Sequence, residues 1–203
     1  MLYFISGGVR SGKSTFALNL ALSFAHPANT IYYVATSIPY DAEMNERIKR
    51  HQKERRRLKN RIVTIEQPKH IEVLSEKFSS RDVVLIDCLT TLVSNELFHG
   101  WEKKENHWQK ERYRKDVFTR LIATISNLKK KEITVIIVSN ELANGMMPQD
   151  EGTFNYLEML GKLHTELVSL ADYAILVENG IPIYKKGREM RLKELCFKEP
   201  LPM

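Results

Sequence analysis

The feature that most constrains this chain is a glycine-rich run near its start. Residues 7–14 read GGVRSGKS, directly follow the apolar stretch Leu2–Ile5, and fit the pattern G-x-x-x-x-G-K-[ST]. Glycines let successive backbone N–H groups turn inward around phosphate oxygens, and the start of the following helix adds the positive end of its dipole. The sequence therefore predicts a strand, a phosphate-binding loop and a helix in that order, with a nucleotide as the ligand.

Within this loop, two side chains have expected roles. Lys13 should reach the β and γ phosphates as a point charge, and the Ser14 hydroxyl should help to coordinate Mg²⁺. A glycine-rich turn without a ligand is the alternative, but the strand and helix that flank the loop favour a nucleotide site. The nucleotide contacts predicted here are Gly7, Gly8, Val9, Arg10, Ser11, Gly12, Lys13 and Ser14.

A second candidate for Mg²⁺ binding follows the apolar run Val83–Ile86. Asp87 ends this run, where proteins with a phosphate-binding loop place the acid that orients Mg²⁺ or its waters. The alternative is an Asp that only caps the next helix through backbone N–H groups. We predict Asp87 and Ser14 as the metal-binding pair, acting partly through water.

Apolar runs alternate with helical patterns along most of the chain, which predicts an α/β fold. The sheet should be mostly parallel, P-loop NTPase-like, with helices on both faces, and Asn179–Pro182 should turn a short antiparallel edge strand back at the C-terminal end. The predicted strands are Leu2–Ile5, Ile31–Ala35, Arg61–Ile65, Val83–Ile86, Thr134–Val138 and Tyr173–Val177. The predicted helices are Ser14–Phe24, Asp41–Leu58, Ile71–Phe78, Thr90–Phe98, Trp108–Lys129 and Thr153–Ala171.

The bulk properties fit one domain over residues 1–187, followed by a basic tail over 188–203. The chain has 203 residues and two cysteines, without a C-x-x-C pair, so a reducing cytoplasm is expected. No run of 18 apolar residues and no signal peptide is visible, so we expect no membrane span. The net charge is +6, and basic side chains are concentrated at residues 47–59, which favours a solvated helix face or a triphosphate-facing patch. Because no aromatic residues are interleaved with them to stack on bases, we expect no nucleic-acid partner.

Two further polar groups could contact a nucleotide. Thr36 and Ser37 end the second predicted strand, and their hydroxyls suit a ribose, a phosphate or a base edge, although they could also cap a helix. His51 lies in the basic helix with Arg50 and Arg55 nearby, and such cations lower a histidine pKa and keep the ring neutral, as a nucleophile must be. From composition alone His51 is more often a surface histidine.

Several blocks together resemble the bifunctional adenosylcobinamide kinase / adenosylcobinamide-phosphate guanylyltransferase family of cobalamin biosynthesis. They run in order from residue 2 to about residue 186. The blocks are GGVRSGKS, YVATS, a helix reading D-x-E-M-x-x-R-I-x-x-H, LIDCLTTLVSN, VSNELANGMMP and ADYAILVENGIP.

The resemblance implies phosphorylation of adenosylcobinamide by GTP or ATP, followed by transfer of GMP from GTP through a histidine-bound intermediate. The nucleophile would be His51, Lys13 would serve the phosphoryl transfer, and the enzyme would form a homo-oligomer, by resemblance a trimer. The further nucleotide contacts that the family implies are Thr36, Ser37, Ile38, Gln52, Lys53, Glu54, Arg55, Glu66 and Asp87.

The chain departs from the family pattern in three places. Residues 55–60 read RRRLKN where the family has Arg-Pro and then Trp, and Ala143 replaces a glycine, where a left-handed backbone would be strained. The helix 156–165 lacks both usual arginines and an amide pair, so a different alcohol acceptor or a non-catalytic nucleotide-binding paralogue remain alternatives.

Overall fold

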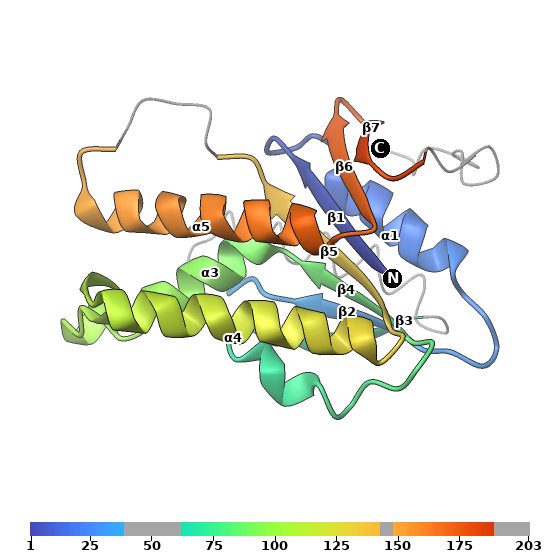
Figure 1. Ribbon diagram of the computed structural model, residues 1–203, viewed down its shortest axis with the longest axis horizontal. Coiled ribbons are helices and arrows are strands. Elements are labelled where there is room, and N and C mark those ends of the chain that lie inside the picture. The colour runs from blue at the N-terminus through green and yellow to red at the C-terminus, as the bar shows by residue number, and fades with distance from the viewer. Residues whose placement is uncertain (39–61, 143–147, 189–203) are drawn as a thin grey trace.

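A computed structural model describes residues 1–38, 62–142 and 148–188 of the chain. Its described strands form one seven-stranded sheet with the order β3-β2-β4-β5-β1-β6-β7 (Figure 1). The pairs are parallel except for β6 and β7, which pair antiparallel as the sequence predicts. The strands are β1 (Leu2–Gly7), β2 (Ile31–Ala35), β3 (Ile62–Glu66), β4 (Val83–Asp87), β5 (Thr134–Asn140), β6 (Tyr173–Glu178) and β7 (Ile181–Lys186).

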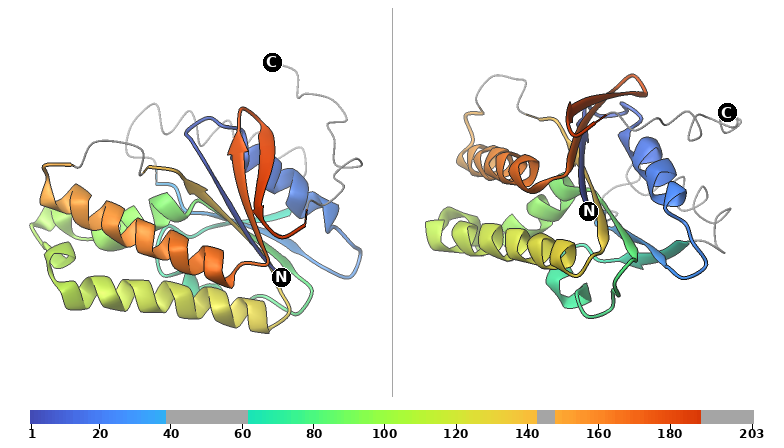
Figure 2. Two further views of the ribbon diagram at one scale, coloured as in Figure 1. Left: turned by 45° about the horizontal axis from the view of Figure 1, so that its top comes forward. Right: turned by 45° about the vertical axis from the view of Figure 1, so that its right-hand side comes forward.

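Helices lie on both faces of this sheet. Helix α1 packs on one face, and α3, α4 and α5 pack on the other, as the right-hand view of Figure 2 shows. The α/β prediction is therefore confirmed. The α-helices are α1 (Lys13–Ser23), α3 (Leu89–Leu97), α4 (Glu111–Lys130) and α5 (Glu151–Leu170), and the short 3₁₀ turns are Ile71–Leu74, Trp101–Lys103 and His107–Gln109.

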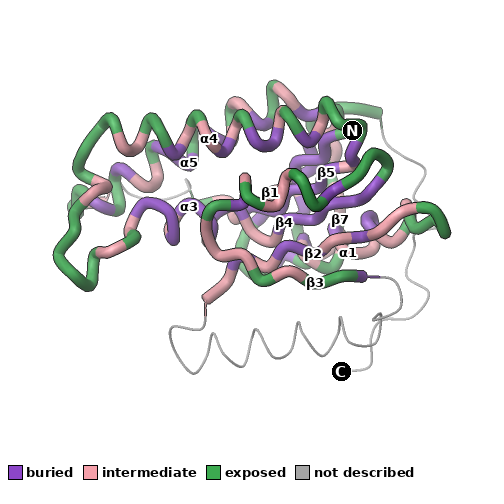
Figure 3. The backbone as a smooth tube through the Cα atoms, turned by 90° about the horizontal axis from the view of Figure 1, so that it is seen from below, coloured by how far each residue is buried: buried purple, intermediate pink, exposed green. Residues whose placement is uncertain are grey.

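The two faces of β1 show why the sheet needs both helix layers. Leu2 and Phe4 point into the core formed with α3, α4 and α5, whereas Tyr3 and Ile5 point into the core under α1. Side chains alternate between faces along a strand, and all four are at most 3% exposed. Figure 3 shows buried residues along the central strands and exposed ones along the outer sides of the helices.

One predicted helix is wrong in type. Residues Ile71–Phe78 form only the 3₁₀ turn Ile71–Leu74, continued by separate turns such as the hydrogen bond from Lys77 N to the Leu74 carbonyl. Ile71 and Phe78 are still buried, because successive turns bring them to the same face that a helix would. The other expected helices begin and end within three residues of their predicted bounds, except Asp41–Leu58, which lies outside the described residues. None of the described helices is long and apolar enough to cross a membrane.

Candidate nucleotide and metal site

The phosphate-binding loop joins β1 to α1 and strongly favours glycine at two positions. A Cβ atom on Gly7 would overlap the carbonyl oxygen of Val177. Gly12 has a φ of +89°, and a Cβ there would lie 3.2 Å from the Cα of Gly180, in the turn between β6 and β7. The same turn is bonded to the loop, because Gly180 N donates to the Ser11 carbonyl oxygen at 2.8 Å. The antiparallel hairpin thus supports the back of the loop.

Lys13 is folded into this loop. It is 5% exposed, and its Nζ donates to the Gly8 carbonyl oxygen at 2.8 Å. An ammonium held against the loop backbone lies where phosphate oxygens would meet the inward-facing N–H groups. Beside it, the Ser11 hydroxyl oxygen is buried and has no hydrogen-bond partner among the described residues. Both groups suit a loop built to receive a polar ligand.

The predicted metal pair comes together at the start of α1. The Ser14 hydroxyl donates to Oδ1 of Asp87 at 3.3 Å, although 73 residues separate them. The Tyr33 hydroxyl donates to the other carboxylate oxygen, Oδ2. Because Tyr33 pairs with Leu85, Asp87 two residues later lies on the same face of the sheet. Tyr33 was not singled out from the sequence; its place two residues before the end of β2 was the signal available.

A hydroxyl and a carboxylate next to a phosphate-binding loop form a donor set of hard oxygens. Mg²⁺ prefers such oxygens, and it is bound through one or two protein groups together with substrate phosphates. Ser14 and Asp87 therefore fit the metal that the sequence analysis expects.

The other residues predicted after β2 and β3 lie at the same edge of the sheet. Ala35 pairs with both Asp87 and Glu66, so these carboxylates end strands on either side of β2. Glu66 is exposed, and Ser37 and Ile38 are half-buried. The nucleotide contacts predicted for these residues are compatible with this arrangement.

Thr36 has a different role from the one expected of its hydroxyl. It is fully buried, its Oγ1 donates to the Cys88 carbonyl oxygen at 2.9 Å, and it accepts from the Cys88 N–H at 2.8 Å. The hydroxyl is thus used, as donor and as acceptor, to hold the backbone of Cys88, the residue that follows Asp87. These bonds help to position Asp87, the carboxylate predicted to bind the metal.

A polar cluster under α5 extends the site toward the other helix layer. Thr90 accepts a hydrogen bond from Asn140 Nδ2 at 3.0 Å through its hydroxyl and another from the Tyr156 hydroxyl at 3.1 Å through its carbonyl. His164 Nε2 lies 2.7 Å from the Ser139 hydroxyl, and burial lowers the pKa of His164, which favours the neutral ring. The altered helix 156–165 thus contributes one hydrogen bond to α3, through Tyr156, and one to the carboxyl end of β5, through His164.

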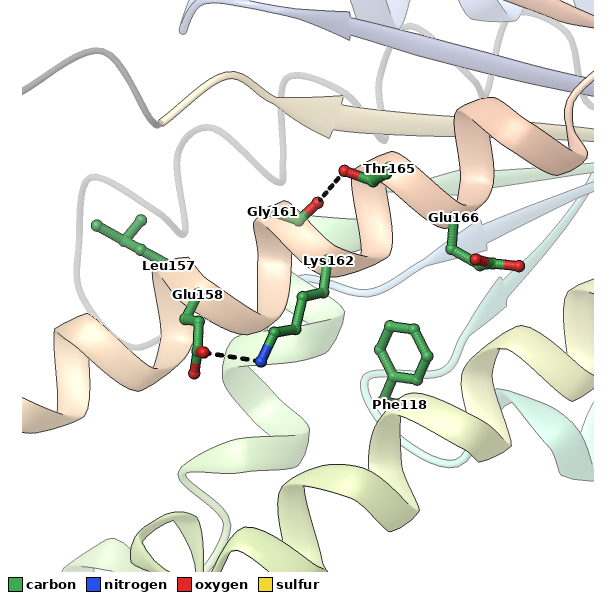
Figure 4. A pocket seen from close by; sticks show the side chains of 7 residues that line it. All are labelled: Phe118, Leu157, Glu158, Gly161, Lys162, Thr165 and Glu166. Carbon is green, nitrogen blue, oxygen red and sulfur yellow. Dashed lines mark hydrogen bonds and ion pairs between the residues drawn. The ribbon is translucent and has the colours of Figure 1, made fainter.

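Leu157 and Lys162 stand in this helix where the family pattern has arginines. Both line a groove between α4 and α5. The groove has a volume of about 500 Å³, and Figure 4 shows Leu157 and Lys162 along it with Phe118 opposite. Lys162 forms an ion pair with Glu158 on its own helix at 2.7 Å. No residue of the phosphate-binding loop lines this groove, so these two substitutions lie outside the site described above.

Another cluster, His70, Glu72 and Glu96, has the composition of a metal site but is occupied by a cation of the chain itself. Arg120 donates to Glu72 at 2.7 Å and to both carboxylate oxygens of Glu96 at 3.1 and 2.8 Å. Burial would raise the pKa of Glu96, but hydrogen bonds from Arg120 and the His70 N–H outweigh it and hold that pKa below 4.5. The cluster is an internal ion-pair network joining α3 to α4.

Several predicted site residues fall outside the described residues. These are His51 and its neighbours Gln52, Lys53, Glu54 and Arg55. Ala143, which departs from the family pattern, also lies outside them. Their roles remain predictions.

Fold and loop together define an α/β protein with a P-loop NTPase-like fold. Two solved structures are similar at the level of the fold. The flagellar accessory protein FlaH from Methanocaldococcus jannaschii has a TM-score of 0.51 and 17% identity, over 92% of this chain and 78% of its own. An ATPase from the type III secretion system of pathogenic bacteria has a TM-score of 0.52 and 15% identity, over 96% of this chain and 57% of its own.

The sequence comparisons are more specific. The model of the cobinamide kinase / cobinamide phosphate guanyltransferase family matches residues 3–184, and the chain belongs to this family. The bifunctional adenosylcobalamin biosynthesis protein CobU of Salmonella typhimurium is 30% identical and that of Escherichia coli 28%, each over 90% of this chain and 98% of the relative. Protein CobP of Pseudomonas aeruginosa, with the same description, is 28% identical over 92% of this chain and 98% of its own. Family membership confirms the resemblance described from the sequence.

Proposed function

We propose that this protein is the bifunctional enzyme of its family: it phosphorylates adenosylcobinamide and then transfers GMP from GTP to the phosphate, giving adenosylcobinamide-GDP. The observation that carries the proposal is the Ser14–Asp87 contact at 3.3 Å beside an intact phosphate-binding loop, in a chain that matches the family over residues 3–184. The nucleotide is GTP, or ATP for the first step.

In the kinase step, the loop orients the triphosphate through its backbone N–H groups and Lys13. Negative charge spreads over the phosphoryl group as it transfers, so catalysis rests on positioning and on cationic stabilisation more than on covalent chemistry. Mg²⁺, held by Ser14 and Asp87, supplies positive charge to the phosphate oxygens when it is bound. Tyr33 and Thr36 keep Asp87 oriented toward the loop.

In the guanylyl step, His51 acts as the nucleophile. A ring nitrogen of His51 bonds to the α-phosphorus of GTP while the bond to pyrophosphate breaks. A phosphate oxygen of adenosylcobinamide phosphate then attacks the same phosphorus and releases the histidine. Two displacements replace one difficult transfer, as in other covalent mechanisms.

The test is incubation of the purified protein with Mg²⁺, GTP and adenosylcobinamide, followed by mass analysis of the corrinoids. We expect adenosylcobinamide-GDP. Formation of the phosphate alone would refute the guanylyl step, and no corrinoid product with GTP binding intact would refute the proposal. GTP labelled at the α-phosphate should give acid-labile protein label, and a His51→Ala variant that labels as well as the wild type would exclude His51. A cytoplasmic location and a homo-oligomer, in the form of a trimer, belong to the same proposal.

A further inference from the structure

A cavity that the phosphate-binding loop does not line lies at the C-terminal end of α3. It has a volume of about 880 Å³ and is lined by residues of the segment that joins α3 to α4 and of the start of α5. Figure 1 shows both segments at the same end of the molecule. Ligand pockets commonly measure about 300–1,000 Å³, so the cavity suits a large ligand. None of the loop residues 7–14 lines it, and the triphosphate would therefore leave it open for a second substrate.

The wall of the cavity carries both tryptophans of the chain. Trp108 packs edge-on against Phe98, with ring centroids 6.2 Å apart. Trp101 is 62% exposed, although tryptophan is a residue that gains much from burial. The wall of the cavity thus combines a packed aromatic pair, Phe98 and Trp108, with the largely solvent-exposed indole ring of Trp101.

The turn that carries Trp101 is well defined. Lys103 N donates to the Gly100 carbonyl at 2.8 Å, and Lys104 N donates to the Trp101 carbonyl at 2.9 Å. Gly100 has a φ of +80°, and a Cβ atom there would overlap the side chain of Glu105. An ordered turn therefore keeps the exposed indole at the rim of the cavity, which reduces the entropy cost of binding a ligand there.

The cavity is connected to the metal site through hydrogen bonds. Asn95 lines the cavity and donates from Nδ2 to the Thr36 carbonyl at 2.8 Å. Thr36 in turn holds the Cys88 peptide group, directly after Asp87. Two residues, Asn95 and Thr36, therefore link the wall of the cavity to the backbone that follows Asp87.

The charges on the described wall argue against a polyphosphate in this cavity. Two lysines, Lys69 and Lys103, are balanced by three carboxylates, Glu102, Glu105 and Asp150. A nucleotide phosphate would meet at least as many negative as positive groups, whereas a ligand with neutral amide arms would find both donors and acceptors.

We propose that this cavity binds the corrin macrocycle of the acceptor, with Trp101 packing on its apolar edge and its amide side chains on the polar wall. The alcohol arm then extends from the cavity toward the phosphate site. The inference rests on the proposed function, and it makes Trp101 a specificity residue for the corrinoid instead of for the nucleotide.

The test compares Trp101→Ala with Trp101→Phe and with Phe154→Ala, an aromatic control that is 38% exposed on α5 and does not line the cavity. For each full-length variant, calorimetry gives the Kd of adenosylcobinamide and of GTP, and kinase assays give kcat and the KM for adenosylcobinamide. We expect Trp101→Ala to raise the corrinoid Kd and KM about tenfold, which corresponds to 1.4 kcal/mol. The kcat and the Kd of GTP should stay within about twofold, since no group at the phosphate site changes; Trp101→Phe should show a smaller loss and Phe154→Ala none.

Each result has a distinct meaning. If the wild type acts on adenosylcobinamide but Trp101→Ala keeps its corrinoid Kd and KM, the cavity assignment is wrong and the proposed function stands. If Trp101→Ala weakens GTP instead, the cavity holds the nucleotide and the assignment is overturned. If the wild type neither binds nor modifies adenosylcobinamide, the proposed function fails and the cavity assignment fails with it.

Discussion

Replacement of Thr36 by valine tests how the fold holds Asp87, the carboxylate proposed to bind the metal. Valine has nearly the shape of threonine but lacks the hydroxyl that bonds both the N–H and the carbonyl of Cys88. Thr36 is fully buried, so water has little access to satisfy these groups in its place. The variant therefore removes two hydrogen bonds with little change in packing.

The magnitude follows from the group that loses its partner. The Cys88 N–H has only the Thr36 hydroxyl as its acceptor among the described residues, whereas the Cys88 carbonyl oxygen still accepts from Leu92 N at 3.1 Å. A buried donor left without a partner costs about 1–3 kcal/mol, so the free energy of unfolding should fall by about that amount. With a urea slope of about 2–3 kcal/mol per M, the unfolding midpoint should fall by about 0.5–1 M. Urea unfolding followed by circular dichroism measures this shift. In kinase assays we expect a lower kcat, because the backbone of Cys88 adjoins Asp87. The Kd of GTP should change less, because the phosphate-binding loop is unchanged.

Thr36→Ser is the matched control. Serine keeps the hydroxyl and loses one buried methyl group, which costs about 1 kcal/mol. We therefore expect the serine variant to be more stable than the valine variant and to keep more of the kinase activity. If the valine variant has a urea midpoint and a kcat equal to or higher than those of the serine variant, the hydrogen bonds of the Thr36 hydroxyl do not stabilise the site.

Three further perturbations have defined outcomes. Gly12→Ala should raise the Kd of GTP at least tenfold, as measured by calorimetry, because a φ of +89° is strained for alanine and its Cβ atom would lie only 3.2 Å from the Cα of Gly180; unchanged affinity would contradict this explanation. Asp87→Asn should raise the Mg²⁺ concentration needed for half-maximal kinase activity about 10–100-fold, and a shift smaller than threefold would exclude Asp87 as a ligand. Glu96→Gln should destabilise the protein by about 2 kcal/mol near neutral pH, since it weakens the ion pair with Arg120. Because the pKa of Glu96 in the folded protein lies below 4.5, the ion pair stabilises the protein above pH 4.5, and this stabilisation is lost as the pH falls through the folded pKa. The difference in urea midpoint between the variant and the wild type should therefore disappear in acid. A difference that is constant with pH would contradict the ion-pair explanation.

The local pattern of the sequence determined much of this protein. The strand, loop and helix over residues 2–24 were predicted because glycine spacing and apolar periodicity are local properties of the chain. Asp87 was recognised in the same way, as a carboxylate at the end of a buried run. The 3₁₀ turn at Ile71–Leu74 was missed, since the burial pattern of successive turns resembles that of a helix.

Only the tertiary structure decided which side chains meet at the site. The register of β2 against β4 brings Tyr33 to Asp87, and the same pairing turns the Thr36 hydroxyl inward to Cys88. The cavity beside Trp101 likewise forms where the end of α3 meets the start of α5, more than 50 residues later in the chain. Such contacts depend on strand register and helix packing between distant segments, and no periodicity within one segment encodes them.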